Sequence, residues 1–218
     1  MKSILNKTRF FLFPLVIFIL VASSLLLIYS KADIFFFINR HNSPLGDFIF
    51  RYATWLGDGV IIALISIVLL FFRYRWAIIS MGVYLFSGLI VQVMKRFIFT
   101  DALRPYKVFG NTPDLHLVEG VKMYANHSFP SGHTTSAFGM FFILSWLVPQ
   151  RYLKILFFLL AFLVAYSRMY LSEHFLIDVT VGSILGVASS LLFIWWIQSA
   201  KASWLDRSLM DLFKNSDS

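Results

Sequence analysis

Long apolar runs alternate with short polar segments along most of the chain. Six of these runs approach the roughly 20 residues that an α-helix needs to cross the hydrocarbon core of a bilayer. The pattern predicts six membrane-spanning helices, at residues 10–29, 55–72, 76–94, 134–149, 152–170 and 176–197. A further run at residues 34–38 is too short to span, and we expect it to lie in the membrane interface within an amphipathic segment.

The composition supports a membrane protein. Of the 218 residues, 59% are apolar and 14% are charged, whereas a soluble domain has about 45–50% and about 25%. The absence of cysteine excludes a disulfide-stapled secreted domain, and the apolar content excludes a disordered chain. We predict an all-α polytopic membrane protein whose six helices form a bundle, with one membrane-embedded domain over residues 1–218.

The distribution of charge predicts an orientation. With the amino terminus inside, the cytoplasmic segments hold ten of the 19 basic residues and three of the 11 acidic ones. The positive-inside rule then places both termini in the cytoplasm. Because basic residues beside membrane spans usually set topology, the net charge of +8 does not indicate a nucleic-acid partner. The first apolar run is longer than the roughly 7–15-residue core of a signal peptide, so we expect it to be an uncleaved anchor.

Ionisable side chains gather where the predicted spans meet the loops on one side of the membrane. Lys95 and Arg104 follow the third span, His133 begins the fourth, and Arg168 ends the fifth. The loops after the third and fifth spans share a side if the span count is correct. Since ionisable groups at membrane depth are costly, their presence indicates a functional site.

A histidine lies just before the sixth predicted span, and an aspartate lies in its first turn. His174 and Asp178 are four residues apart, so on a helix they share a face, and the carboxylate can accept the imidazole Nδ1–H. Nε2 is then free to act as a nucleophile. Taken alone, the pair also fits a buried structural histidine, but the guanidinium of Arg168 nearby suits a phosphate.

The segment Pro130-Ser131-Gly132-His133 opens the fourth predicted span. Ser131 can cap the new helix, Gly132 lets the backbone approach a ligand closely, and free amides at a helix start bind anions. Ordinary turn chemistry also explains Pro-Ser-Gly. It leaves unexplained why His133 follows directly and faces the same side as the His174–Asp178 pair.

Three segments of the chain resemble, in their order, the motifs of the type 2 phosphatidic acid phosphatase family. They are Arg104-Pro105, then Pro130 to His133, then Ser167-Arg168 with His174 and Asp178. The resemblance covers residues 95–178. One position departs from the family pattern, which has a lysine separated by six residues from Arg-Pro. Phe97 stands there in this chain, and Lys95 precedes Arg104 by nine residues. We favour Lys95 for this role over Arg96, which also fits a membrane anchor.

The resemblance implies a mechanism that uses a phosphohistidine. His174 would attack phosphorus, Asp178 would hold its tautomer, and His133 would protonate the leaving oxygen and then activate water. The phosphate would be bound by Lys95, Arg104, Arg168 and the amides around Ser131 and Gly132. Neither a metal nor another cofactor is required.

These features predict a phosphatase that removes the terminal phosphate of a lipid phosphate or pyrophosphate. Its expected setting is a bacterial inner membrane, with the site facing the periplasm. The family offers undecaprenyl pyrophosphate, phosphatidylglycerophosphate, phosphatidic acid and lipid A as candidate substrates. A lipid phosphotransferase with the same intermediate is an alternative. A transporter or non-catalytic binding protein is another, but the broken helices paired in two halves that it predicts are not apparent. Gly182 and Gly186 indicate close helix packing.

Overall fold

The computed structural model describes residues 1–113 and 115–214, and every regular element among them is helical. The longer helices are α1 (Lys2–Ile28), α2 (Lys31–Arg40), α3 (Pro44–Ala53), α4 (Gly59–Phe72), α5 (Tyr74–Val93), α7 (Gly132–Leu147), α8 (Arg151–Tyr170) and α9 (Leu176–Ser199). The short ones are η1 (Thr54–Gly57), η2 (Met94–Ile98), α6 (Pro105–Phe109), η3 (Ser203–Asp206) and α10 (Leu209–Lys214). The all-α prediction is confirmed.

Length and composition support only part of the predicted span count. Among the described residues, four helices are long and apolar enough to cross a membrane: α1, α8, α9, and α5 continued through η2 to Ile98. A fifth candidate is the pair Pro44–Gly57 and Gly59–Phe72, which bends by 53°. Helix α7 has 16 residues, which corresponds to about 24 Å of helix against a hydrocarbon core of about 30 Å. The structure therefore supports four or five spans, and six remains a prediction.

Two local features explain where elements begin. Helix α4 begins at Gly59 rather than at residue 55, because Oδ1 of Asp58 accepts a hydrogen bond from the amide of Val60 at 2.8 Å and caps the helix. Residues 34–38 belong to the ten-residue helix α2, which begins with a capping box between Ser30 and Asp33. The short apolar run is thus helical, and too short to span.

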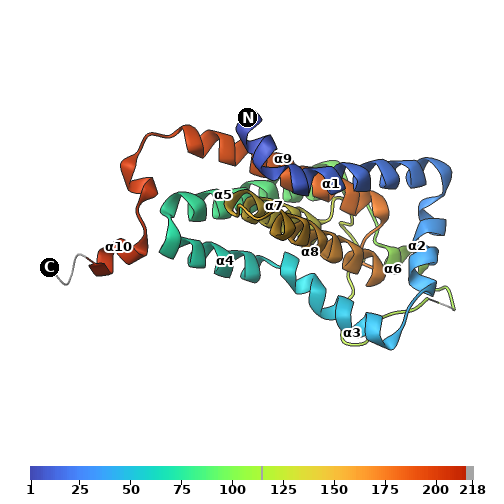
Figure 1. Ribbon diagram of the computed structural model, residues 1–218. Helices are drawn as coiled ribbons and strands as arrows, with labels where there is room; N and C mark the ends of the chain where they lie inside the picture. The colour runs from blue at the N-terminus through green and yellow to red at the C-terminus, as the bar shows by residue number, and fades with distance from the viewer. Residues whose placement is uncertain (114, 215–218) are drawn as a thin grey trace.

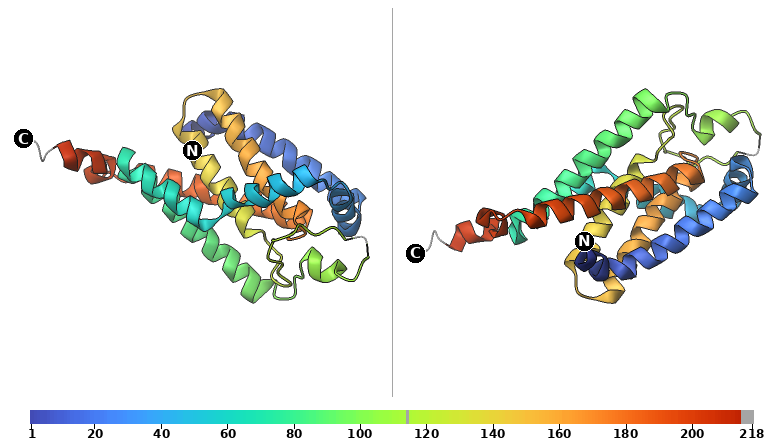
Figure 2. Two further views of the ribbon diagram at one scale, coloured as in Figure 1. Left: turned by 90° about the horizontal axis from the view of Figure 1, so that it is seen from below. Right: turned by 90° about the horizontal axis from the view of Figure 1, so that it is seen from above.

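Helix α7 lies in the middle of the bundle, with α8 and α9 packed along it and α5 on a further side (Figure 1). The views in Figure 2 show that α1 runs along α8 and α9, and that α4 and α5 form a hairpin. Phe138 and Phe142 of α7 are fully buried, and both rings meet Phe11 of α1 edge to face. The aromatic contacts hold the short central helix inside a shell of longer ones.

Small residues let α7 and α9 approach closely, as the sequence predicted. A Cβ atom on Gly186 would lie 2.8 Å from the amide nitrogen of Gly139, and one on Gly182 would lie 2.8 Å from the carbonyl oxygen of Ser131. A larger residue at either position would push the helices apart. Because the amide of Ser131 also donates to the carbonyl oxygen of Asp178 at 3.1 Å, this contact sets the start of α7 against the start of α9.

Candidate active site

The predicted site residues converge on a cavity of about 550 Å³ at the end of the bundle where α5 ends and α7 begins. Those that line it are Lys95, Arg104, Gly132, His133, Arg168 and His174. The turn between η1 and α4 forms another part of the wall. The loops that follow α5 and α8 therefore lie at the same end of the bundle, as inferred from the order of the spans.

His174 is held from behind by Asp178. Nδ1 of His174 lies 3.2 Å from Oδ2 of Asp178, and the histidine is 1% exposed. The same carboxylate oxygen accepts hydrogen bonds from the hydroxyl of Ser128 and from the amide of Phe175, the latter at 2.9 Å. An ionised carboxylate accepts hydrogen bonds and cannot donate one. The proton in the contact with Asp178 is therefore on Nδ1 of His174, and Nε2 keeps its lone pair.

The surroundings of His174 favour the neutral imidazole. Burial lowers its pKa well below the usual 6.5, and the nearby charges of Arg104, Arg168 and Lys95 lower it further. A neutral ring is the form that can attack phosphorus.

Two arginines and a glutamate form a buried cluster beside the histidine. The carboxylate of Glu173, which is 1% exposed, forms an ion pair with Arg104 and another, at 3.2 Å, with Arg168. Arg168 also donates to the hydroxyl of Thr54 at 2.7 Å, and Arg104 donates to the carbonyl oxygen of Asn126 at 3.0 Å. Burial lowers the pKa of Arg104. These contacts fix both guanidiniums at the cavity wall.

Lys95 reaches the cavity from a π-helical turn. The amide of Phe99 bonds to the carbonyl oxygen of Met94 at 2.7 Å, a spacing of five residues that defines η2. Lys95, within this turn, is 8% exposed and lines the cavity, whereas Arg96 is exposed and does not line it. A π-helical turn accommodates an additional residue. This helps to explain how Lys95 reaches the cavity although it stands two positions before Phe97, where the family pattern has its lysine.

Ser131 and Gly132 differ in their surroundings. The hydroxyl of Ser131 is buried and accepts hydrogen bonds from the amide and the hydroxyl of Thr134, at 3.5 and 2.9 Å. Its own amide is occupied by the carbonyl oxygen of Asp178. Ser131 thus caps α7, and of the two residues Gly132 is the one that lines the cavity.

His133, the second residue of α7, lines the cavity beside the turn between η1 and α4. Its Nε2 lies 3.9 Å from Oδ2 of Asp58. A Cβ atom on Gly57 would lie 2.6 Å from the carbonyl oxygen of His133, so the chain before α4 can approach this closely only with glycine. The turn thus contacts the backbone of His133 through Gly57 and faces its ring through Asp58.

Sequence reasoning missed Ser128, Glu173 and Asp58 as parts of the site. Glu173 directly precedes His174 and lies inside a motif, which was the one available signal. Ser128 and Asp58 gave no signal, because they contact residues 50 and 75 positions away.

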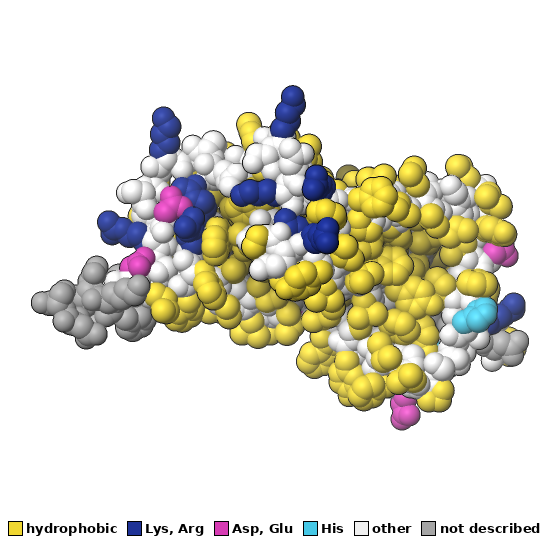
Figure 3. All heavy atoms as spheres, in the orientation of Figure 1, with side chains coloured by type: hydrophobic (Ala, Val, Ile, Leu, Met, Phe, Trp, Pro, Cys, Tyr) yellow, Lys and Arg dark blue, Asp and Glu magenta, His cyan; other side chains and the backbone are white. Residues whose placement is uncertain are grey.

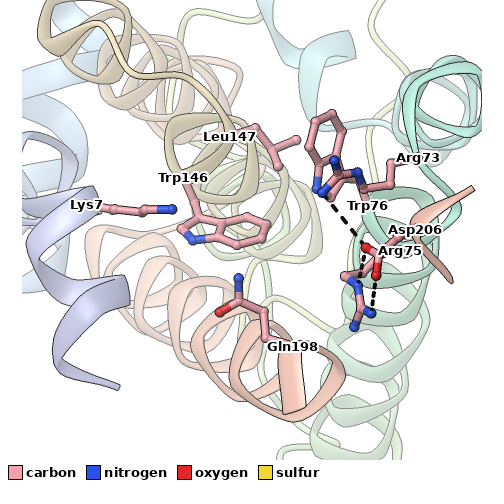
Figure 4. A pocket seen from close by; sticks show the side chains of 8 residues that line it. All are labelled: Lys7, Arg73, Arg75, Trp76, Trp146, Leu147, Gln198 and Asp206. Carbon is pink, nitrogen blue, oxygen red and sulfur yellow. Dashed lines mark hydrogen bonds and ion pairs between the residues drawn. The ribbon is translucent and has the colours of Figure 1, made fainter. Parts of the chain in front are cut away.

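A second cavity, of about 340 Å³, lies at the other end of the bundle (Figure 4). Arg75 on its wall donates twice to Asp206 at 2.9 Å and to the carbonyl oxygen of Ala200 at 3.1 Å. These bonds connect the segment after α9 to the start of α5. No histidine is among the described residues that line this cavity, whereas the first cavity has two.

The family model of the PAP2 superfamily matches residues 76–202, more than half of the chain. The chain therefore belongs to the PAP2 superfamily of membrane phosphatases. It is 33% identical to the lipid A 4'-phosphatase of Bacteroides thetaiotaomicron over 91 residues, which are 42% of this chain and 40% of that protein. It is also 33% identical to the bacitracin transport permease protein BcrC of Bacillus licheniformis over 92 residues, 41% of this chain and 42% of that protein. The chain thus spans about two fifths of the length of these relatives.

Two solved structures share the fold. LpxE from Aquifex aeolicus superposes with a TM-score of 0.66 at 29% identity, covering 75% of this chain and 94% of that one. The first transmembrane PAP2 type phosphatidylglycerolphosphate phosphatase from Bacillus subtilis superposes with a TM-score of 0.64, covering 91% of this chain and 99% of that one. At 23% identity the second likeness shows the fold alone. The chain is an integral membrane protein with several apolar helices.

Proposed function

We propose that this protein hydrolyses the terminal phosphate of a lipid phosphate or lipid pyrophosphate through a phosphohistidine on His174. The observation that carries the proposal is the convergence of the His174–Asp178 pair, His133 and a set of basic side chains on one cavity. The basic side chains are Lys95, Arg104 and Arg168.

The proposed reaction has two steps. Nε2 of His174 attacks phosphorus, a P–N bond forms, and the P–O bond to the lipid breaks as His133 donates a proton to the leaving oxygen. His133 then removes a proton from water, which attacks the phosphohistidine and releases inorganic phosphate. Asp178 holds the proton on Nδ1 throughout, and Lys95, Arg104 and Arg168 stabilise the phosphoryl oxygens in both transition states.

The shape of the cavity supports a substrate carried by a lipid. Before Lys95, α5 contributes Tyr84, Leu85 and Gly88 to the lining, and Gln92 follows them. Leu85 is exposed, and a Cβ atom on Gly88 would meet nothing within 4 Å, so the stretch from Tyr84 to Gly88 is open and mainly apolar. A phosphate held by the cations could extend its apolar chain along α5. Undecaprenyl pyrophosphate, phosphatidylglycerophosphate, phosphatidic acid and lipid A remain the candidate classes.

We further propose six spans within a single domain over residues 1–218, with both termini cytoplasmic. Basic side chains gather at the end of the bundle that carries the chain termini, while apolar side chains cover much of the remaining surface on the face shown in Figure 3. This distribution supports the orientation by the positive-inside rule. The cavity, at the other end, would then face the periplasm of a bacterial inner membrane.

We propose that the reaction needs no metal. Among the described residues, no three His, Cys, Asp or Glu side chains are grouped as a metal site would require. Three basic side chains line the cavity, and their charge can offset that of the phosphate as a metal ion does in metal-dependent enzymes.

The test is phosphate release from a panel of lipid phosphates by the protein purified in detergent. His174→Ala should abolish release, and His41→Ala, at an exposed histidine at the end of α2, should leave it unchanged. Release that survives His174→Ala at the original rate would contradict the proposal. Transfer of the phosphate to an acceptor lipid, without free phosphate, would indicate the phosphotransferase instead.

A further inference from the structure

Among the described residues, Asp58 is the one acidic side chain that lines the cavity. Asp58 lies at the bend between η1 and α4, lines the cavity, and has a side chain that is 47% exposed. Oδ1 caps α4 through the amide of Val60, which leaves Oδ2 to face the ring of His133 at 3.9 Å from Nε2. The turn of Gly57 against the backbone of His133 fixes this arrangement.

The separation of the two groups leaves the histidine available to substrate. At 3.9 Å, Oδ2 of Asp58 and Nε2 of His133 are too far apart for a hydrogen bond. Burial lowers the pKa of His133 to about 2, and the nearby charges of Arg168, His174, Arg104 and Lys95 add to this shift. The carboxylate of Asp58 is close enough to oppose the shift and to stabilise a protonated ring. The His133 side chain is 35% exposed, so its Nε2–H can still be donated into the cavity.

The cavity lining therefore carries charges of both signs, with Lys95, Arg104 and Arg168 as the basic side chains and Asp58 as the acidic one. In the proposed reaction the three basic side chains bind the transferred phosphoryl group. In the proposed reaction the leaving oxygen must meet Nε2 of His133, which places the leaving group next to Asp58. A negative leaving group would approach a carboxylate there, whereas an uncharged one would not.

We propose that Asp58 is a specificity-determining residue that selects phosphate monoesters over diphosphates. This assignment rests on the proposed function. A monoester loses an alkoxide, which must take a full proton from Nε2 of His133 as the P–O bond breaks, and the adjacent carboxylate favours the protonated ring that supplies it. In a diphosphate the leaving group is the lipid monophosphate, which needs this proton less and brings negative charge toward Asp58. Like charges brought together in this way disfavour the second substrate.

The test compares dodecyl phosphate with dodecyl diphosphate, which share one apolar chain. The ratio of their kcat/KM values is measured for the unmodified protein, Asp58→Asn and Asp58→Ser. Asparagine and serine both cap helices well, so each keeps the start of α4 while it removes the negative charge. Asp101→Asn, at an exposed acid outside the cavity, is the matched control, and His174→Ala gives the background.

We expect the unmodified protein to prefer the monophosphate. Both Asp58 variants should lower the monophosphate-to-diphosphate ratio by at least about tenfold, through a lower kcat for the monophosphate, and Asp101→Asn should not change it. A His174-dependent activity whose ratio stays within twofold in both variants overturns the assignment of Asp58 alone. Absence of His174-dependent release from both substrates in the unmodified protein overturns the proposed function, and the assignment with it.

Discussion

The two adjacent cations after α5 offer a sharp test of how the site binds phosphate. Lys95 is 8% exposed and lines the cavity, whereas Arg96 is exposed and lies outside it. Replacing each with alanine in separate variants removes one positive charge at nearly the same point of the chain. The two variants differ in whether that charge faces the phosphate.

The size of the effect follows from the burial of Lys95. A hydrogen bond from a charged donor contributes roughly 1.5–3 kcal/mol, and each 1.36 kcal/mol is about tenfold in rate. We therefore expect Lys95→Ala to lower kcat/KM by about 10- to 150-fold, and Arg96→Ala to change it by less than about twofold. Because Lys95 is buried and stands near Arg104 and Arg168, both its burial and the neighbouring like charges disfavour its charge, and Lys95→Ala should not make the folded protein less stable.

The assay is phosphate release from a lipid monophosphate by each variant in detergent, with thermal unfolding measured on the same samples. A larger loss in Arg96→Ala than in Lys95→Ala would refute the reasoning. So would equal losses in both variants, because the position of the charge would then not matter.

Other predictions test the remaining parts of the site. Asp178→Asn should lower kcat by about a thousandfold or more with little change in KM, because the amide no longer holds the proton on Nδ1 of His174; steady-state kinetics measures this, and a loss confined to KM would contradict it. Glu173→Gln leaves two buried guanidiniums without their acid, and should lower the free energy of unfolding by about 3–5 kcal/mol. Added inorganic phosphate should then raise the melting temperature of this variant more than that of the unmodified protein, and an equal rise would count against the cluster as the phosphate site. Activity should persist in EDTA; loss in EDTA that a divalent cation restores would indicate a metal mechanism. Finally, the lowered pKa of His174 means that below pH about 6.5 the unfolded chain binds a proton that the folded protein does not. The free energy of unfolding should therefore decrease as the pH is lowered below that value, and His174 should contribute at most about 1.4 kcal/mol per pH unit to the decrease. Unfolding measured over a pH series should show a shallower decrease for His174→Ala.

The helical framework was predictable because long apolar runs specify helices without reference to the rest of the fold. The differences came from particular residues. Asp58 lies near one end of the second predicted span, where the unbroken apolar run begins only at Gly59, and its bond to the amide of Val60 shows that it caps the helix that begins there. Helix α7 is central and largely buried, and its 16 residues are fewer than a candidate span needs by length, so its crossing of the membrane stays a prediction.

The candidate site was predictable to the extent that its residues lie in local motifs. The His174–Asp178 contact follows from a spacing of four on a helix, and the structure shows it at 3.2 Å. The position of Lys95 depends on a π-helical turn, which a pattern of 3.6 residues per turn does not reveal. Glu173 contacts Arg104 across 69 positions, and such a pairing is set by the fold rather than by sequence spacing.

The most direct test of the account is to trap the phosphoryl group on the protein. The unmodified protein and His133→Ala, in which water is no longer activated, are mixed with a lipid diphosphate labelled with ³²P in its terminal phosphate, because its leaving group needs little protonation by His133, and are quenched within one turnover. We predict protein-bound phosphate that is stable in base and labile in acid, carried by the peptide that contains His174, more abundant in His133→Ala and absent from His174→Ala. Label on another residue, or label that persists in His174→Ala, would contradict the account.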